Sequence, residues 1–309
     1  MPELEIKRLV KHSPISGSAN NKYKNVIFGS LFVIAGIIFI IIVSHNRPPG
    51  DQSEMPFPLV ISTLLFFPFF GIWIIIASLK EIFRNKKMEN IQKFYPNEPW
   101  RWDYSWDSTG INDRSVKSAE KAFGFGIFLT LFLMPFNWVA FISGQIPEAR
   151  ITCGLIVGFF DLLVIMIFGY SIYLFSRKRK YGPGRLKFIS FPYFPGSELN
   201  VTFQTEKKLS DIRQLKATLR FIEERYEMRG GNIETICYQL YADTLTLTGQ
   251  DFKYNNLLTL DLKFSLPQNG CETKLKDRPA KYWELEIMAD THGIDYHASF
   301  LLPIYSSSY

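Results

Sequence analysis

The chain is poor in cysteine: its 309 residues include only Cys153, Cys237 and Cys271. These form no CxxC pair and no Cys/His group with metal-site spacing, which argues against a disulfide-stapled scaffold and against a zinc site. The sequence also lacks HExxH, GxSxG and P-loop signatures, and with them the usual marks of metalloproteases, α/β-hydrolases and nucleotide hydrolases. We therefore expect a protein that is not an enzyme and that uses no cofactor.

Charge is missing from four long segments. Residues 26–44, 57–79, 122–143 and 151–176 contain no Lys or Arg, and only the last contains an acid. About twenty apolar residues cross the hydrocarbon core of a bilayer, so we predict four transmembrane helices within a membrane domain at 26–180. The first apolar run is longer than that of a cleaved signal peptide, which indicates a permanent anchor.

The net charge of +6 could indicate nucleic-acid binding, but its distribution favours a membrane. Of the 20 basic residues in 1–180, 18 lie in the tail 1–25, in the loop 80–121 and in the run "RKRK" at 177–180. This asymmetry predicts that those segments are cytoplasmic. We expect a multi-pass integral membrane protein with both termini in the cytoplasm, a lipid bilayer as its partner and no nucleic acid.

The hydrophobic period changes after "RKRKYGPGR". From residue 181 onward, apolar residues alternate with polar ones, as in "LLTLDLKFSL" at 257–266. Seven such stretches in about 120 residues, several separated by turn signals, predict a cytoplasmic β-sandwich at 181–309. They are "RLKFIS", "LNVTF", "LKATLRF", "ETICYQLY", "LLTLDLKFSL", "YWELEIMA" and "YHASFLL". "DTHG" at 290–293 should close the last hairpin, with Gly293 free to take a positive φ.

These C-terminal motifs carry a resemblance. "PGSELNVTF", "ATLRFIEERYE" and "YWELEIMADTHGIDYHASFLLPIY" resemble the arrestin-like (immunoglobulin-like) β-sandwich. The whole chain resembles uncharacterised bacterial multi-pass membrane proteins that end in one such domain. The resemblance implies a binding or scaffolding role without an established reaction, and a sandwich core and last hairpin that use Trp283, Leu285, Gly293, Asp295, Phe300, Pro303 and Ile304.

The segment "EPWRWDYSW" at 98–106 holds three of the six tryptophans, Trp100, Trp102 and Trp106. Pro96 and Pro99 should stop any helix that continues from the second span. Because the indole ring is apolar and its N–H is polar, Trp favours the headgroup region of a membrane. We interpret the cluster as a membrane-interface belt or as a pad that docks the sandwich, in preference to a ligand-stacking site.

Asp161 is the one charged residue inside the predicted spans, about ten residues into the fourth helix. An acid at that depth costs about 2.5–3.5 kcal/mol on insertion scales and should face a partner or water. We expect a protonated Asp161 that hydrogen-bonds Asn137 or Thr130 of the third helix, and we favour this over proton or ion transport. Gly154 and Gly158 form a GxxxG pattern that predicts close helix packing.

"DTHGIDYH" places Asp290, His292, Asp295 and His297 close together in the sequence. On a hairpin nothing fixes their mutual geometry, so we predict no metal site. The sequence as a whole favours a non-enzymatic scaffold that presents its sandwich to a protein partner. The rivals are a small transporter or channel subunit that uses Asp161, and a membrane hydrolase whose nucleophile–base pair we do not find. Homo-oligomerisation is left open.

Overall fold

A computed structural model gives the structure of the chain. It describes residues 6–10, 12–15, 22–46, 57–113, 116–142, 147–209, 212–248, 257–268 and 271–306. The chain divides into two compact units. The helical unit holds residues 20–86 and 119–173, and the sheet unit holds 1–19, 87–118 and 174–309.

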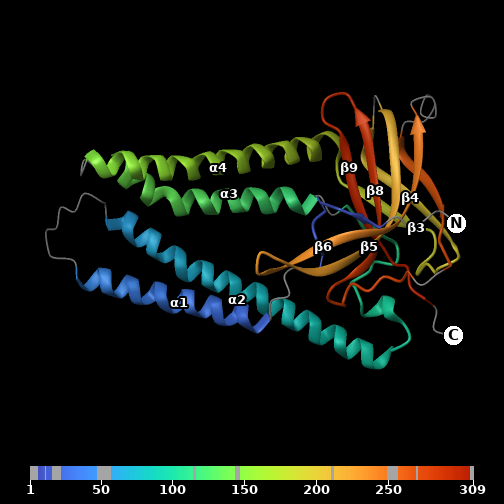
Figure 1. Cartoon of the computed structure of the whole chain (residues 1–309), viewed down its shortest axis with the longest axis horizontal. Coiled ribbons are helices and arrows are strands. Elements are labelled where there is room, and N and C mark those ends of the chain that lie inside the picture. Colours follow the sequence, from blue (N-terminus) through green and yellow to red (C-terminus); the bar gives the residue numbers. More distant parts are fainter. Residues whose placement is uncertain are drawn as a thin grey trace. The chain divides into compact units, whose positions relative to one another are not determined.

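Four long helices carry the apolar segments: α1 (Lys22–His45), α2 (Phe57–Phe94), α3 (Val116–Asn137) and α4 (Pro147–Tyr181) (Figure 1). A π-helical turn, Trp138–Ile142, follows α3. All four helices are long and apolar enough to cross a membrane. α2 continues 15 residues past Leu79, into the predicted loop, because residues 80–94 are mostly good helix formers and the first proline comes at Pro96.

Within the helical unit, close packing by glycine joins α1 to α2. A Cβ atom on Gly29 would lie 2.8 Å from the carbonyl oxygen of Gly71, so the two backbones touch there. The close packing expected at Gly154 and Gly158 stays a prediction, because few atoms of the described residues lie near either glycine. A Cβ atom on Gly154 would meet only Phe141, at 3.6 Å, and one on Gly158 would meet nothing within 4 Å. Small-residue contacts therefore form, but between the first pair of helices.

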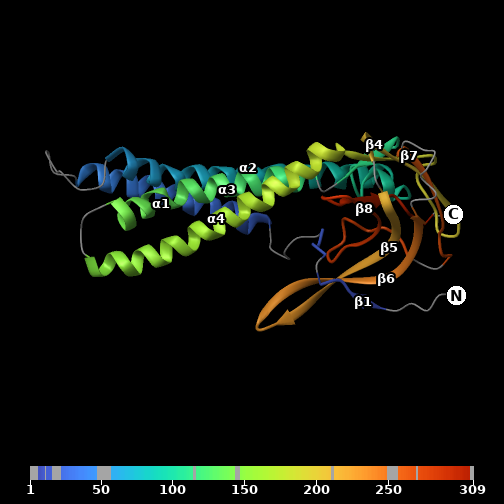
Figure 2. The same cartoon turned by 90° about the horizontal axis from the view of Figure 1, so that it is seen from above.

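The sheet unit contains two antiparallel sheets. In the five-stranded sheet the order is β1-β6-β5-β8-β9, and in the four-stranded sheet it is β2-β3-β4-β7 (Figures 1 and 2). The strands are β1 (Lys7–Arg8), β2 (Gly110–Asn112), β3 (Gly184–Phe188), β4 (Glu198–Leu209), β5 (Ile212–Arg229), β6 (Asn232–Thr248), β7 (Leu257–Ser265), β8 (Lys281–Thr291) and β9 (Tyr296–Leu302).

Both sheets contribute to one buried core, so the sheet unit is a β-sandwich. Phe203 of β4 contacts Phe300 of β9, with 6.0 Å between ring centroids. Val201 and Leu262 of one sheet and Leu219 of the other are fully buried in the same cluster. The seven strands predicted from alternation are all present as β3 to β9. Alternation succeeded because each of these strands buries one face against the other sheet.

Two further strands come from outside the predicted sandwich. β1 belongs to the N-terminal tail and pairs with β6. β2 belongs to the segment 95–115 between α2 and α3, which we call the tryptophan-rich loop, and pairs with β3. The boundary predicted at residue 181 therefore differs from the observed unit, which also takes in residues 1–19 and 87–118. With two and three residues, β1 and β2 are too short for a hydrophobic period to reveal them.

Two hairpins shape the five-stranded sheet. Gly293 adopts φ +87° in the connection between β8 and β9, as expected from "DTHG". β5 and β6 form a longer hairpin that turns at Gly230 and Gly231, which have φ values of +56° and +85°. The tip of that hairpin projects from the sheet (Figure 2). Positive φ at two successive positions is what a two-residue hairpin turn of type I′ requires, and glycine adopts it without strain.

Candidate interaction surface

Asp103 is the residue that fixes the tryptophan-rich loop to the sandwich. Its Oδ2 accepts the backbone N–H of Leu275 at 2.8 Å, and its Oδ1 accepts that of Lys276 at 2.6 Å. The Tyr305 hydroxyl donates to Oδ2 at 3.0 Å. Burial raises the pKa of Asp103 above its ordinary value, and the hydrogen bonds from Leu275 and Lys276 offset only part of that effect. The carboxylate is thus one junction for three donors.

Trp106 extends this junction. Its Nε1 donates to the Tyr305 hydroxyl at 2.8 Å, so indole, phenol and carboxylate form a chain of hydrogen bonds. The Trp106 ring also packs against Tyr104, with 4.7 Å between centroids. Tyr305 is fully buried, and burial together with the charge of Asp103 raises the pKa of its hydroxyl. Tyr305 is therefore a neutral phenol whose hydroxyl accepts a hydrogen bond from Trp106 and donates one to Asp103, and it thereby links the loop to the sandwich.

The other two tryptophans have different surroundings. Trp100 lies 6.4 Å from both Phe194 and Tyr305, measured between ring centroids. Trp102 donates from Nε1 to the carbonyl oxygen of Tyr95 at 3.0 Å, and the Lys276 ammonium lies 5.3 Å from its ring centroid. All three tryptophans thus contact the sandwich, and Trp102 also contacts the segment just after α2.

A hollow of about 610 Å³ adjoins this cluster. Aromatic rings, including those of Tyr95, Trp100 and Trp106, line it together with Lys87 and Arg101. The Arg101 guanidinium lies 4.4 Å from the Tyr95 ring centroid and is paired with Glu98, which neutralises much of its charge. The hollow is wide and open. If the tryptophan cluster were a ligand-stacking site, the alternative named above, this hollow is where the ligand would lie.

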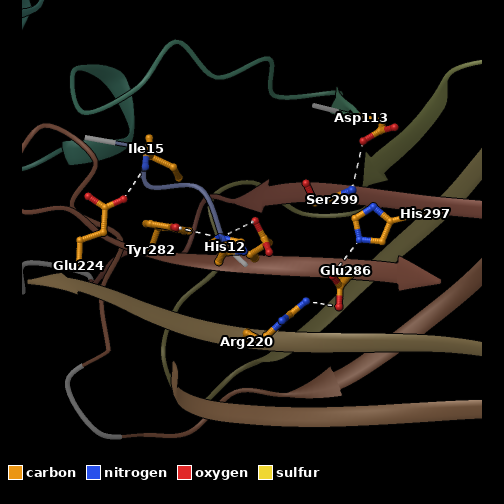
Figure 3. Close-up of polar contacts among 10 residues, drawn as sticks. His12, Ile15, Asp113, Arg220, Glu224, Tyr282, Glu286, His297 and Ser299 are labelled. Atoms are coloured by element: carbon orange, nitrogen blue, oxygen red, sulfur yellow. Dashed lines mark hydrogen bonds and ion pairs between the residues drawn. The ribbon is translucent and has the colours of Figure 1, made fainter. Parts of the chain in front are cut away.

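Asp113, near the C-terminal end of the loop, is a second polar residue that attaches the loop to the sandwich. Asp113 is 7% exposed, and its Oδ1 accepts the backbone N–H of Ser299 on β9 at 3.1 Å (Figure 3). Its own N–H donates to the carbonyl oxygen of Gly184, next to the β2–β3 pairing. The loop is therefore attached at both ends, by Asp103 and by Asp113.

The outer face of the five-stranded sheet, away from the main core, carries a second apolar cluster that we call the outer cluster. Its buried members are Ile222, Cys237, Ala280, Tyr282 and Leu301. Segments from elsewhere in the chain cover it. Leu9 and Ile15 come from the N-terminal tail, and Tyr104, Trp106 and Ile111 come from the loop. An outer sheet face is normally polar and wet, so this covering is a specific feature of the unit.

The same face carries an ion-pair group farther along β8. Glu286 pairs with Arg220, and its Oε1 lies 2.9 Å from Nε2 of His297 (Figure 3). Burial alone would raise the pKa of Glu286, but the hydrogen bonds from His297 and Arg220 and the charge of Arg220 lower it from 4.5 to about 2. His297, considered above for a metal site, thus contacts Glu286. In the described part of the chain, no three His, Cys, Asp or Glu side chains are grouped as metal ligands would be.

In the helical unit, the structure brings two of the predicted polar residues together. Asn137 Nδ2 donates to Asp161 Oδ1 at 3.0 Å and also to the Leu133 carbonyl oxygen at 3.2 Å. Thr130 instead donates to the carbonyl oxygen of Gly126 in its own helix. A hydrogen bond between α3 and α4 of this kind satisfies part of the polar requirement of Asp161 without a further ligand.

The predicted residues of the sandwich core and last hairpin have clear places. Trp283, Leu285 and Phe300 are at most 1% exposed and belong to the main core. Asp295 Oδ1 accepts the N–H of Thr291 across the last hairpin at 3.2 Å, and the Pro303 carbonyl oxygen accepts the N–H of Tyr193 at 2.9 Å. These residues therefore pack in the core or form hydrogen bonds within the sheet unit.

Sequence reasoning missed the residues that join the segments, above all Asp103, Tyr305, His12 and Glu224. Their partners lie far away in the sequence: 202 residues separate Asp103 from Tyr305, and 209 separate Ile15 from Glu224. The one available signal was that Asp103 stands as an acid inside an aromatic run. Such an acid in an apolar setting needs donors.

Comparisons with known proteins add little. No family model matches the chain, and no curated protein matches it. Among solved structures, it is similar to the crystal structure of Spo0M, a sporulation control protein from Bacillus subtilis, with 14% sequence identity and a TM-score of 0.28. The match covers 40% of this chain and about half, 49%, of that one. A likeness of that size carries no argument about fold or function.

Proposed function

We propose that the protein is a non-enzymatic scaffold or adaptor of the bacterial inner membrane, in which α1 to α4 are the anchor and an arrestin-like β-sandwich is presented at the inner leaflet to a protein partner. The observation that carries the proposal is the composition of the sheet unit. That unit includes the tail before α1, the last turns of α2, the start of α3 and the last turns of α4. It therefore takes in one end of α2, of α3 and of α4, together with the tail that precedes α1.

These three helix ends and the tail before α1 lie in the segments that the charge pattern assigns to the cytoplasm. The tail, the loop 80–121 and the run at 177–180 carry 18 of the 20 basic residues of 1–180. The resemblance of "YWELEIMADTHGIDYHASFLLPIY" to arrestin-like domains adds a binding role for the sandwich. The Asp161–Asn137 hydrogen bond favours a structural role for this acid over the transporter alternative.

The topology predicts the outcome of reporter fusions. A reporter that is active only in the cytoplasm should be active when fused after residue 90 or 309 and inactive after residue 50. The reason is that the loop 80–121 and the run 177–180, which flank the first two sites, carry 9 and 4 of the 20 basic residues of 1–180, whereas the connection around residue 50 carries only Arg47. A reporter active only outside the cytoplasm, fused at the same positions, is the control and should give the opposite pattern. Activity of the cytoplasmic reporter after residue 50 would refute the orientation.

The adaptor role predicts position-dependent crosslinking in intact cells. A photo-crosslinking side chain placed at Met288 or Ile189 of the sheet unit, which are 47% and 66% exposed, should capture one and the same protein, identified by mass spectrometry. Phe69 of α2 is 68% exposed, lies in the helical unit and is the matched control. We expect the capture to be absent there. Capture at Phe69 alone, or at no position, would contradict the proposal.

A further inference from the structure

The N-terminal tail occupies the five-stranded sheet in the manner of a bound peptide. Lys7 and Arg8 pair antiparallel with Gln239 and Tyr238 of β6, and the N–H of Leu9 donates to the carbonyl oxygen of Cys237 at 2.9 Å. The tail then leaves the edge and crosses the outer face. It thereby combines backbone pairing at an edge with side-chain contacts on a face, the two components of peptide recognition by strand addition.

Side chains of the tail fill the apolar part of this site. Leu9 and Ile15, six positions apart, both pack on the outer cluster, where Ile222 and Tyr282 are fully buried. Without the tail, part of that cluster would lack its cover, although residues of the tryptophan-rich loop would still protect the rest. The tail therefore places two apolar side chains, six positions apart, on the outer cluster.

Two buried carboxyl groups provide the polar part. Glu224 is 0% exposed, and its Oε1 accepts the backbone N–H of Ile15 at 2.5 Å (Figure 3). Glu284 is 1% exposed, and His12 Nε2 lies 3.6 Å from its Oε2 and 3.1 Å from the Tyr282 hydroxyl. Buried acids on an outer sheet face are costly unless a donor or a cation approaches them. Here the tail supplies the N–H of Ile15 to Glu224 and places the His12 ring beside Glu284, and its sequence is rich in Lys and Arg.

The edge of β6 is longer than the strand that covers it. Within the described residues, β6 runs from Asn232 to Thr248, yet β1 pairs with it at only two positions. The stretch 240–248, "LYADTLTLT", with which no described residue pairs on this side of β6, contains one charge and no Lys or Pro. Exposed edge strands of natural sheets usually carry charged residues, especially Lys, or Pro, which prevent pairing with other chains. A longer strand than β1 can therefore pair along this edge.

We propose that this surface, the tail groove, binds an extended basic segment of a protein partner by strand addition to β6, in the place that residues 6–10 and 12–15 occupy. The tail groove consists of the β6 edge, the outer cluster, Glu224 and Glu284. The inference rests on the proposed adaptor function and identifies the surface that the partner uses. The tail is then a competitor in the same chain, and a partner binds when it displaces the tail.

The test uses a fluorescein-labelled synthetic peptide of residues 6–15 and the full-length protein in detergent, measured by fluorescence anisotropy. A variant that lacks residues 1–15 should bind the peptide saturably. The intact chain should bind the peptide at least about tenfold more weakly, because the attached tail competes at an effective concentration in the millimolar range. A peptide carrying Leu9→Asp and Ile15→Asp should bind neither protein.

Matched variants on β8 separate the groove from general charge. In the deletion background, Glu284→Gln should weaken the peptide at least severalfold, because His12 then loses its carboxylate. Glu286→Gln changes the same residue type two positions along, where the partners are Arg220 and His297, and should leave binding unchanged. Equal losses in both variants would contradict the groove.

Folding is checked by thermal unfolding of each variant. If the deletion does not fold, the full chain carrying Leu9→Asp and Ile15→Asp replaces it, since its tail should no longer occupy the groove. The inference is overturned if the folded deletion variant, or the folded double-aspartate variant that replaces it, does not bind the peptide. It is also overturned if the intact chain binds the peptide as tightly as that variant does. The adaptor function fails separately: crosslinked partner without peptide binding rejects the groove alone, and peptide binding without any crosslinked partner rejects the adaptor role.

Discussion

Replacing Trp283 with alanine should lower the free energy of unfolding of the sheet unit by about 3–5 kcal/mol, the range for large-to-small changes of core aromatic residues. Trp283 is 1% exposed and lies 5.3 Å from Phe221 and 5.4 Å from Tyr241, measured between ring centroids. Its Nε1 also donates to the carbonyl oxygen of Cys271 at 2.6 Å. The alanine variant therefore leaves a cavity and takes the donor from a carbonyl group.

The measurement needs the whole chain in detergent. A fragment that begins at Gly184 would lack β1, β2, Asp103 and Trp106, which complete the sandwich. Unfolding by urea can be followed through Cys237, which is 2% exposed. Burial and the nearby charge of Glu224 raise the pKa of this thiol to about 11, so it stays protonated and unreactive until the unit opens.

A matched control distinguishes core packing from the loss of any tryptophan. Trp73 of α2 is 66% exposed and lies in the helical unit. Trp73→Ala should leave the urea dependence of Cys237 labelling unchanged. A Trp283→Ala variant that labels like the wild type would show that this ring contributes nothing to the core.

The length of the predictable elements explains what the sequence could reveal. β4 to β9 have seven or more residues each and bury one face, so alternation marks them. Composition marks the four apolar helices. The end of α2 at Phe94 is marked by Pro96 and not by hydropathy, because the apolar run stops at Leu79. Long, periodic elements follow from local pattern alone.

The contacts that attach the N-terminal tail and the tryptophan-rich loop to the sandwich do not follow from local sequence pattern. β1 and β2 exist because an edge strand was already there to pair with, and neither has a period of its own. The role of Asp103 depends on Leu275, Lys276 and Tyr305, which reach it only in the folded chain. Asp161 and Asn137 are different, because a polar residue in an apolar helix signals its need for a partner whatever the fold.

Replacing Asp103 with alanine should detach the tryptophan-rich loop and destabilise the sheet unit by about 3–5 kcal/mol. The variant removes the acceptor of three donors, and each buried donor left without a partner costs about 1–3 kcal/mol. The losses are not additive, because water enters once the loop loosens. The carboxylate charge itself is not the source of stability, since burial has raised the pKa of Asp103.

The sign of that shift gives the Asp103→Asn variant a distinct behaviour. A folded-state pKa above the unfolded value of 3.8 means that the contribution of Asp103 is greatest below pH 3.8 and declines as the pH rises through the folded pKa. Asparagine keeps one acceptor oxygen and carries no charge. It should therefore cost less than alanine at neutral pH, and the part of the pH dependence due to residue 103 should disappear.

Hydrogen exchange followed by mass spectrometry reports on the joint directly. The amides of Leu275 and Lys276, which donate to Asp103, should exchange faster in Asp103→Ala, together with peptides covering residues 98–112. Asp107 is the matched control: it lies four positions away in the same loop, its side chain is 60% exposed, and it contacts Thr109 and Arg185. Asp107→Ala should leave both amides protected. Equal protection in the two variants would mean that the loop is held by Trp106 and β2 without Asp103, and the hydrogen-bond chain through Tyr305 would then be a consequence of docking instead of its cause.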